Sequence, residues 1–241
     1  MKLWPPILDD PGRCGYLPDR DWTLEYQIAL EIDAAEYASR MLAGWRRFGR
    51  SLFRPACEGC QECRPIRVDV ARFAPDRSQR RARKANQGDV LLEIGEPSAS
   101  RENLDLYRRY HAHQAGAKQW PDRRREGAAE YVESFVDNPF PTEEWRFRID
   151  GRLVGVGYVD SLPVGLSAIT FIYDPDCRSR SLGTWNVLAL IDRARSLGLP
   201  HVYLGYLVEG CGSMAYKARF LPSEIRGADG IWREFRGIRS G

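Results

Sequence analysis

The sequence predicts a mixed α/β (α+β) fold with two parts of different character. Apolar and polar residues alternate over short stretches along the whole chain, as they do in strands with one buried face. Between these stretches, longer segments carry apolar residues at helical spacing. The chain of 241 residues is 43% hydrophobic and 29% charged, so it can bury a full core and is neither disordered nor fibrous.

The N-terminal part, residues 1–95, is expected to form a cysteine-bearing domain. Three prolines and two glycines before Pro18 indicate an extended arm. Residues 33–43 are predicted to form a helix that ends at Gly44, whereas residues 22–26 could be a strand or an earlier helical turn. Alternation predicts strands at 45–53, 66–70 and 90–94.

The C-terminal part, residues 96–241, is expected to form a second domain. Its predicted elements are helices at 100–114, 128–136 and 182–197 and strands at 145–149, 153–159 and 165–173, with a further strand after the last helix. Asp150-Gly151 is a strong signal for a hairpin turn. The succession of strands around one long helix is that of the GNAT-like acyltransferase fold.

Three thiols lie within seven residues, because Cys57, Cys60 and Cys63 follow a C-x2-C-x2-C pattern. This spacing lets successive sulfurs turn inward onto a zinc ion or an iron–sulfur cluster. Cys14, followed by a flexible glycine, is the candidate for a fourth ligand. The alternative is four ordinary reduced cysteines. The N-terminus has no secretory signal, so we expect a reducing cytoplasmic location.

A dense cationic run follows the cysteines. Five cations fall within eight residues: Arg77, Arg80, Arg81, Arg83 and Lys84. Asp76 or Ser78 is a plausible N-cap, so the run is expected to form a helix. Such a run is usually a solvated helix face, but clustered guanidiniums also bind phosphates, and an RNA site is the competing interpretation.

The start of the helix at 182–197 resembles a phosphate-binding turn. The segment from Arg180 through Gly183 to Thr184 is similar to the R/Q-x-x-G-x-G/A arm with which N-acetyltransferases hold the pyrophosphate of coenzyme A. Trp185 stands where that arm has a small residue. A glycine-eased helix start is therefore the alternative interpretation.

Seven motifs occur in one order over nearly the whole chain: Cys14-Gly15-Tyr16-Leu17-Pro18, Arg54-Pro55 with the three cysteines, Arg77-Ser78-Gln79-Arg80-Arg81, Phe171-Ile172-Tyr173-Asp174-Pro175, Ser181-Leu182-Gly183-Thr184, Tyr203-Leu204-Gly205-Tyr206 and Met214-Ala215-Tyr216-Lys217. Together they closely resemble the aminoacyl-tRNA–protein transferases. The bacterial aspartate/glutamate leucyltransferases are the nearer branch, and arginyltransferase is the eukaryotic relative.

The resemblance implies an enzyme that moves leucine from leucyl-tRNA to the N-terminal α-amine of proteins beginning with Asp or Glu, marking them for the N-degron pathway. Its partners would be aminoacyl-tRNA and such proteins, without a membrane, and we expect a monomer. No cofactor is required, because the ester is already activated. The metal predicted at the cysteines would be additional.

The resemblance also suggests roles for individual residues. Candidates for the general base are Asp174, Tyr203, Tyr206 and Tyr216. Lys217 and Arg77 are candidates to bind the carboxylate of the acceptor. Candidates to bind tRNA are Arg77, Arg80, Arg81, Arg83, Lys84, Arg180 and Gly183.

Three alternative functions stay open at this point. Arginine could be the donor if an acidic residue, among Asp160, Asp174 and Asp176, faces the aminoacyl ester. The turn at Arg180 leaves a coenzyme-A-dependent N-acetyltransferase open. The third alternative is a non-catalytic, metal-bound RNA-binding module in which the cysteines only shape a loop.

Overall fold

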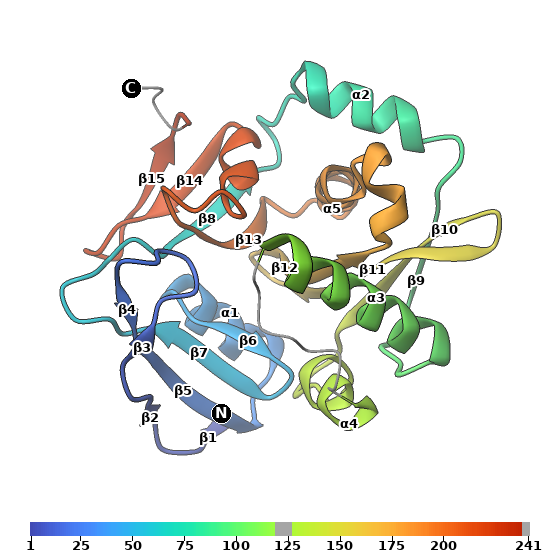
Figure 1. The fold of residues 1–241 in the computed structure, drawn as a ribbon. Coiled ribbons are helices and arrows are strands. Elements are labelled where there is room, and N and C mark those ends of the chain that lie inside the picture. Colours follow the sequence, from blue (N-terminus) through green and yellow to red (C-terminus); the bar gives the residue numbers. More distant parts are fainter. Residues whose placement is uncertain (119–126, 238–241) are drawn as a thin grey trace.

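The structure is a computed structural model that describes residues 1–118 and 127–237. In this part of the chain, two large sheets lie side by side and helices pack around them (Figure 1). The mixed α/β fold predicted from the sequence is confirmed. No helix among the described residues is long and apolar enough to cross a membrane.

A five-stranded sheet with strand order β1-β5-β7-β6, to which β2 adds at β5, forms the N-terminal part. Its elements and those of a small ribbon are β1 (Lys2–Leu3), β2 (Ile7–Leu8), β3 (Gly12–Arg13), β4 (Asp21–Trp22), β5 (Leu24–Glu31), α1 (Ala34–Leu42), β6 (Arg46–Phe48) and β7 (Ser51–Pro55). Residues 22–26 are therefore strand rather than helix. Helix α1 begins at a capping box between Asp33 and Glu36 and packs Tyr37 and Met41 against Leu52 of the sheet.

An eight-stranded sheet of order β15-β14-β8-β13-β12-β11-β10-β9 forms the rest of the framework. The strands are β8 (Arg64–Asp69), β9 (Leu91–Gly95), β10 (Glu143–Ile149), β11 (Arg152–Leu162), β12 (Gly165–Tyr173), β13 (His201–Leu207), β14 (Ser223–Arg226) and β15 (Trp232–Phe235). The helical elements are α2 (Arg77–Asn86), α3 (Arg101–Lys118), α4 (Ala128–Tyr131), η1 (Val132–Val136), η2 (Pro175–Arg180), α5 (Leu182–Ser196) and η3 (Ala215–Arg219).

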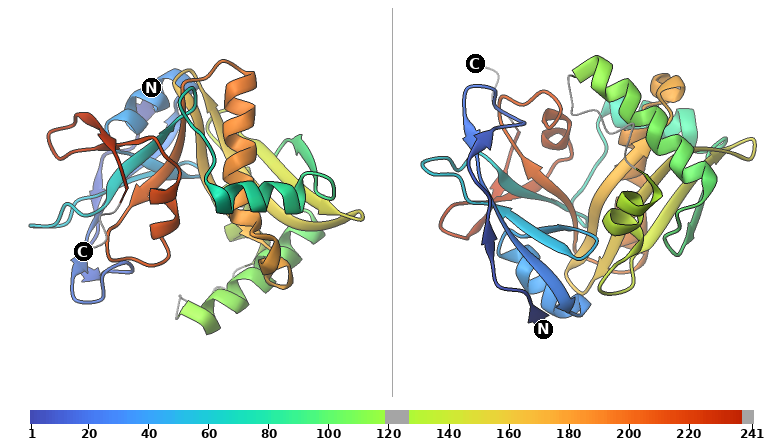
Figure 2. Two further views of the ribbon diagram at one scale, coloured as in Figure 1. Left: turned by 90° about the horizontal axis from the view of Figure 1, so that it is seen from above. Right: turned by 60° about the horizontal axis from the view of Figure 1, so that its bottom comes forward.

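Both faces of the eight-stranded sheet are covered (Figure 2). On one face, α5 buries Leu188 and Ile191 against Trp145 and Phe147 of β10. On the other face, α3 and α4 pack Leu106 and other apolar residues onto β11 and β12. The order of hairpin, strand, long helix and strand that the sequence predicted is present, and the hairpin turns at Asp150-Gly151, where both residues have positive φ.

The eight-stranded sheet includes β8 and β9, which precede residue 95. It therefore joins segments on both sides of the expected boundary, and the division into domains at that residue stays a prediction. A loop was expected at 115–127, but α3 continues to Lys118, and residues 119–126 lie outside the described part.

A buried ion pair ties the two large sheets together. The Arg47 guanidinium from β6 and the Asp160 carboxylate from β11 are both inaccessible to solvent. Arg47 Nε donates to Asp160 over 3.0 Å, and its terminal nitrogens also donate to Thr142 Oγ1 and Asn138 Oδ1. Because every one of these groups is satisfied, the pair fixes how the N-terminal sheet docks on β11.

Candidate active site

The candidate active site lies where two parallel strands of the large sheet diverge. β12 and β13 pair only at Leu166 with Val202 and at Ser167 with Tyr203. Both strands continue well beyond this point, to Tyr173 and Leu207. Their C-terminal halves are therefore unpaired with each other, and in α/β sheets ligands bind in such openings at the carboxyl ends of strands.

Lys217 is fixed at the β13 side of this opening. Its Nζ donates to the backbone carbonyl of Tyr206 over 2.7 Å and lies 3.1 Å from Met214 Sδ. β13 has an irregular register with β8 between Tyr203 and Tyr206, and Gly205 within it adopts φ +76°. A Cβ at Gly205 would lie 3.7 Å from Lys217 Nζ. The bulge thus brings the strand backbone up to the lysine.

Arg46 reaches the same place from the N-terminal sheet. Its guanidinium lies over the Tyr206 ring, 5.2 Å from the centroid. It donates to the carbonyls of Met41, Trp45 and Gly205, while its Nε has no hydrogen-bond partner among the described residues. The Tyr206 hydroxyl donates to Gly44 O over 2.7 Å, which holds this ring between the two sheets.

Lys217 and Arg46 are 7% and 6% exposed, respectively. Within the described residues, neither pairs with a carboxylate, and the acceptors of both are carbonyls or a thioether. Burial, followed by the charge of Arg46, lowers the pKa of Lys217 to about 7, against weaker opposing effects of Cys211 and Cys63. Two adjacent buried basic groups therefore have no acid beside them within the described residues to offset their charge.

Aromatic side chains and an amide line the β12 side of the opening. The rings of Tyr110 on α3 and Tyr173 on β12 lie edge to face at 5.2 Å. Burial raises the pKa of Tyr110 to about 12, and nearby Tyr173 and Tyr216 add to the shift. Gln114, one helical turn beyond Tyr110, is 2% exposed, and its Oε1 has no partner in the described part of the chain.

Of the four predicted catalytic residues, Tyr206 and Tyr216 lie beside Lys217. Tyr216 is 44% exposed, and its ring centroid is 5.9 Å from Lys217 Nζ. Tyr203 is buried at the paired end of the two strands, where its hydroxyl accepts from Arg67 over 3.2 Å. The structure thus gathers Tyr206, Tyr216 and Lys217 and places Tyr203 at the closed end.

Asp174 is fully buried just after β12, at the start of η2. Its carboxylate accepts from Arg109 Nη1 over 2.8 Å, from the backbone N–H of Asp176 over 3.1 Å and from Arg152. Burial alone would raise the pKa of Asp174, but these donors together hold it below its usual value. An ionised carboxylate committed to two guanidiniums is a poor proton acceptor.

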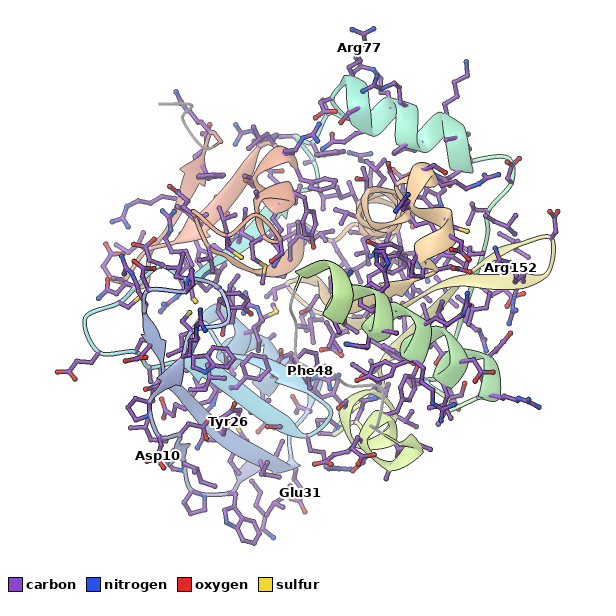
Figure 3. All side chains as sticks on the ribbon, viewed as in Figure 1. Asp10, Tyr26, Glu31, Phe48, Arg77 and Arg152 are labelled. Carbon is purple, nitrogen blue, oxygen red and sulfur yellow. The ribbon has the colours of Figure 1, made fainter. Side chains whose placement is uncertain are left out.

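The predicted tRNA-binding cations divide into two groups. Arg77, Arg80, Arg81 and Lys84 are exposed on one side of α2, while Gln79, Ala82 and Asn86 are buried on the other. The helix begins with a capping box at Asp76, as the sequence suggested. Figure 3 shows Arg77 at the outer end of α2, pointing away from the rest of the molecule. Arg77 and Lys217 are therefore not brought together.

The other predicted tRNA-binding residues either pair with groups of the protein itself or form part of a helix. Arg83 forms a bidentate pair with Asp192 of α5, at 2.7 and 3.0 Å. Arg180 donates to Asp89 and to Ala85 O, both over 2.9 Å, and so joins η2 to the end of α2. Gly183 lies in the first turn of α5.

The arm that carries Cys14 returns to the loop that carries the other three predicted ligands. Thr23 N donates to Cys57 Sγ, and Arg20 donates to Cys60 Sγ, both over 3.4 Å. Burial raises the pKa of the Cys63 thiol to about 12, with further contributions from Cys57, Cys14 and Cys60. All four thiols are unoxidised.

The four thiols have donors suited to sulfur ligands, because the backbone N–H groups of Tyr16 and Leu17 both donate to Cys14 Sγ over 3.4 Å. In the described residues, however, no three His, Cys, Asp or Glu side chains are arranged to hold a metal ion. Metal ligation by Cys14, Cys57, Cys60 and Cys63 therefore stays a prediction.

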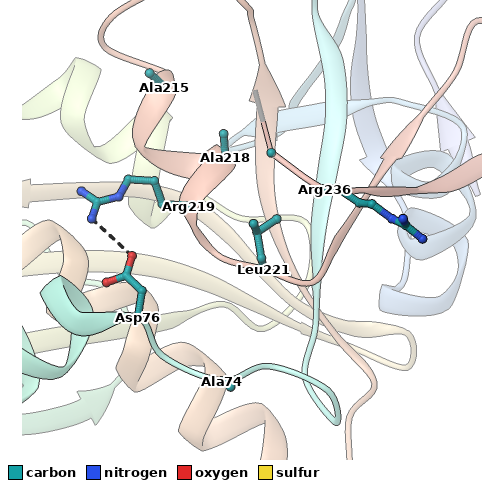
Figure 4. Close-up of a pocket in the computed structure, with 8 residues that line it drawn as sticks. Ala74, Asp76, Ala215, Ala218, Arg219, Leu221 and Arg236 are labelled. Atoms are coloured by element: carbon teal, nitrogen blue, oxygen red, sulfur yellow. Dashed lines mark hydrogen bonds and ion pairs between the residues drawn. The ribbon is translucent and has the colours of Figure 1, made fainter. Parts of the chain in front are cut away.

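A pocket of about 460 Å³ lies between the start of α2 and η3 (Figure 4). Arg219, Asp76 and Arg236 are its charged lining residues, and Arg219 pairs with Asp76 across it. None of the predicted site residues lines this pocket. The chemistry-bearing groups gather instead at the opening between β12 and β13.

Sequence reasoning missed Arg46, Tyr110 and Gln114. Arg46 fell within the strand predicted at 45–53, and Tyr110 and Gln114 fell within the helix predicted at 100–114, without a role in the site. One signal was available in the sequence. Alternation puts Arg46 on the same strand face as Phe48, and an arginine that is buried on such a face needs a partner from elsewhere in the fold. Nothing in the sequence connects residue 46 with residue 205.

Comparison with known proteins gives a consistent match over most of the chain. The family models named "Arginine-tRNA-protein transferase, N terminus" and "Arginine-tRNA-protein transferase, C terminus" match residues 12–81 and 102–227. A Marinobacter nauticus protein named aspartate/glutamate leucyltransferase is 39% identical over 227 residues, covering 93% of each chain. A Pseudomonas fluorescens protein of the same name is 39% identical and covers 89% of this chain and 90% of its own.

Two solved structures show a weaker likeness. The C-terminal domain of a putative lysylphosphatidylglycerol synthetase from Agrobacterium fabrum is 13% identical, with a TM-score of 0.46, and the match covers 70% of this chain and 61% of that one. The L-PGS structure from Bacillus licheniformis is 15% identical, with a TM-score of 0.47, and the match covers 75% and 62%.

Proposed function

Because this chain belongs to the arginine-tRNA-protein transferase family, we propose that it transfers leucine from leucyl-tRNA to the N-terminal α-amine of polypeptides that begin with Asp or Glu. It is a transferase enzyme. The two relatives described above, both named aspartate/glutamate leucyltransferase, support leucine as the donor and an acidic N-terminal residue as the acceptor.

The observation that carries the acceptor assignment is the buried pair of Lys217 and Arg46. An N-terminal Asp or Glu brings a carboxylate, and that carboxylate would supply the anion that the pair lacks within the described residues. Its negative charge would raise the depressed pKa of Lys217 and hold the ammonium charged. A neutral Asn or Gln would instead leave the cations without an acid, which costs on the order of 1–3 kcal/mol.

The reaction is aminolysis of an ester. The α-amine nitrogen attacks the carbonyl carbon of the aminoacyl ester, the bond to the 3′ oxygen of the terminal adenosine breaks, and that oxygen receives the proton that the amine loses. Alignment of the two reactants supplies much of the rate, on the order of 7–11 kcal/mol for well-oriented groups. An α-amine of ordinary pKa is partly neutral near pH 7.5, so a weak base suffices.

Among the predicted catalytic residues, Tyr216 is the one that we propose contacts the reacting amine. Its side chain stands beside Lys217 and is 44% exposed, although burial raises the pKa of its hydroxyl to about 12, whereas the hydroxyl of Tyr206 is committed to Gly44 O. Asp174 and Tyr203 would position their surroundings rather than move the proton, since Asp174 accepts from two arginines and Tyr203 from Arg67.

The aspartates that could bind the side chain of an arginyl donor are already paired with arginines or are exposed. Asp160 is paired with Arg47 inside the protein, and Asp174 with Arg109 and Arg152. Asp176 is exposed. Strand β12 is rich in apolar residues such as Phe171, which is only partly buried against the core, and we propose that this strand contacts the leucyl side chain. This distribution favours leucine over arginine as the donor.

The exposed cations of α2 would bind the phosphates of the tRNA, because Arg77, Arg80, Arg81 and Lys84 project together from one helix face. We place the reaction in the cytoplasm, where charged tRNA and newly exposed protein N-termini occur together, with the protein acting as a monomer. The product would be a substrate for degradation through its new N-terminal leucine.

The direct test supplies the purified protein with radiolabelled leucyl-tRNA, arginyl-tRNA or acetyl-CoA, together with a peptide that starts with Asp. We expect label on the peptide from leucyl-tRNA alone. Label from arginyl-tRNA would replace the donor assignment, and label from acetyl-CoA would make the protein an acetyltransferase. Binding of tRNA without any transfer would leave only the RNA-binding module.

A further inference from the structure

Three aromatic rings form a continuous row on one face of the five-stranded sheet. Tyr26 of β5 lies opposite Phe53 of β7 in the strand register, and their ring centroids are 6.4 Å apart. Phe53 stacks with Phe48 of β6 at 5.5 Å, with only 21° between the ring planes. Phe48 continues edge-on to Phe135 of η1 at 6.1 Å. We call Tyr26, Phe53 and Phe48 the aromatic row.

The aromatic row is open to solvent. Phe48 is 41% exposed, Tyr26 and Phe53 are half-buried, and Ile28 beside them is 37% exposed. Figure 3 shows Tyr26 and Phe48 on the same side of the sheet. Exposed large apolar side chains are common singly, but a contiguous aromatic run on a sheet face marks a surface that contacts a partner.

The row leads directly into the candidate active site. Phe53 lies opposite Arg46 in the register between β6 and β7, so both side chains share one face of the sheet. Arg46 in turn covers the Tyr206 ring, and the Tyr206 carbonyl accepts from Lys217. A molecule lying along the row would therefore have one end at the two buried cations.

We propose that the aromatic row binds the unpaired 3′ end of the charged tRNA by stacking its bases, so that the terminal adenosine arrives at the opening between β12 and β13. The inference rests on the proposed function, since the aminoacyl ester at the 3′ end of the tRNA must reach that opening for leucine to be transferred. Proteins that bind single-stranded RNA stack its bases on aromatic side chains in this way.

The chemistry of the row favours a nucleic acid over the acceptor polypeptide. An extended peptide on a sheet needs backbone donors and acceptors to pair with. Here β5 pairs with strands on both sides, and β7 lies between β5 and β6, so the backbone beneath Tyr26 and Phe53 is already hydrogen-bonded, while β6, which carries Phe48, is the edge strand. The rings of the row offer flat apolar faces on which bases can stack. They would leave the amides of a bound peptide without hydrogen-bond partners.

The test compares the wild type with the double variant Phe48→Leu/Phe53→Leu, which keeps apolar volume but removes two rings. The probes are full-length tRNA carrying a fluorescent cytidine analogue as the middle base of its CCA end, and the same tRNA shortened by the CCA end. Stacking should quench the fluorophore in the wild type and not in the double variant. For each base that no longer stacks, the variant should bind full-length tRNA about 5- to 150-fold more weakly, and it should bind the shortened tRNA as the wild type does.

Two control variants separate stacking from damage to the fold. Phe48→Trp keeps a ring at that position and should retain tight binding and quenching. Leu91→Ala removes a more exposed apolar side chain from β9, at the edge of the other sheet, and should change neither. If the double variant instead raises the KM for the peptide and leaves tRNA binding intact, the row binds the acceptor polypeptide and the inference is wrong.

Failure of the proposed function would look different. A wild-type protein that quenches the fluorophore in a CCA-dependent manner yet transfers no leucine would overturn the proposed reaction and keep the stacking site. A wild-type protein that transfers leucine while the double variant binds full-length tRNA normally would overturn the stacking site alone.

Discussion

Lys217 Nζ donates a 2.7 Å hydrogen bond to the backbone carbonyl of Tyr206, in the part of β13 that has no pairing with β12. The lysine is buried, its neighbouring charged group is Arg46, and within the described residues no carboxylate offsets the two. A cation in such a place weakens the folded protein. We propose that a substrate carboxylate joins it at the opening of the sheet.

Removing the charge of Lys217 should stabilise the free protein in a pH-dependent way. The pKa of Lys217 falls from 10.5 to about 7 on folding, so between these values the unfolded chain binds more protons. The wild type therefore gains stability as the pH rises through this window, and Lys217→Met does not. We expect Lys217→Met to exceed the wild type in Tm at pH 6.5, with the gap narrowing by pH 9.

The groups that face Lys217 are Arg46, Cys211 and Cys63, so the same comparison in a Cys211→Ser background controls for thiol titration. A gap in Tm that stays constant from pH 6.5 to pH 9 would contradict a depressed pKa. It would leave weaker packing or the absent hydrogen bond as the effect of the substitution.

The exposed face of α2 should carry a large part of the affinity for tRNA. Replacing Arg77, Arg80 and Arg81 with alanine should weaken binding and reduce the slope of log K against log salt by about one for each phosphate that is no longer neutralised. Arg83→Ala is the matched control on the same helix, because Arg83 is paired with Asp192. An unchanged salt slope in the triple variant would show that this face is exposed to solvent and does not bind the phosphates of the tRNA.

Removing one member of the buried pair of Arg47 and Asp160 should lower the free energy of unfolding more than replacing both members with apolar residues. Asp160→Asn leaves the Arg47 guanidinium buried without an acid, which should reduce the free energy of unfolding by about 3–5 kcal/mol. Urea denaturation measures this loss. The double variant Arg47→Met/Asp160→Leu should recover a large part of it. A single variant that loses less than about 1 kcal/mol would show that the pair does not hold the sheets together.

The cysteines should bind metal if the predicted ligand set is real. Elemental analysis of protein purified without oxygen should then find zinc or iron, and Cys63→Ser should abolish it. Cys177→Ser is the control, because Cys177 is a buried free thiol beside Arg152. Wild-type protein that contains neither metal, and whose Tm does not change when either metal is added, would show that Cys14, Cys57, Cys60 and Cys63 are not ligands.

Local patterns in the sequence predicted local structure well. The helix expected at 182–197 is α5 (Leu182–Ser196), and Asp76 caps α2 as its position before the cationic run suggested. These features depend on side chains close in sequence. The ambiguous residues 22–26 proved to be strand because β7 pairs with Leu24, Glu25 and Tyr26, which no local pattern reveals.

The site was predictable only in part, for the same reason. Lys217 and Tyr206 stood out in motifs, but their contact requires the bulge at Gly205 and the return of η3. The sequence alone made Asp174 a candidate base. In the fold, Arg109 of α3 and Arg152 of the β10–β11 hairpin both donate to its carboxylate. A residue's type suggests what it could do, and its partners from distant segments decide its charge state.

The central claim is that Lys217 reads the carboxylate of the acceptor, and the ratio of kcat/KM for an Asp-starting peptide to that for the matched Asn-starting peptide tests it most directly. The wild type should prefer Asp by about 5- to 150-fold, the equivalent of 1–3 kcal/mol. Lys217→Met should bring this ratio close to one while its affinity for tRNA stays unchanged. A Lys217→Met enzyme that still prefers Asp by the wild-type margin would contradict the claim.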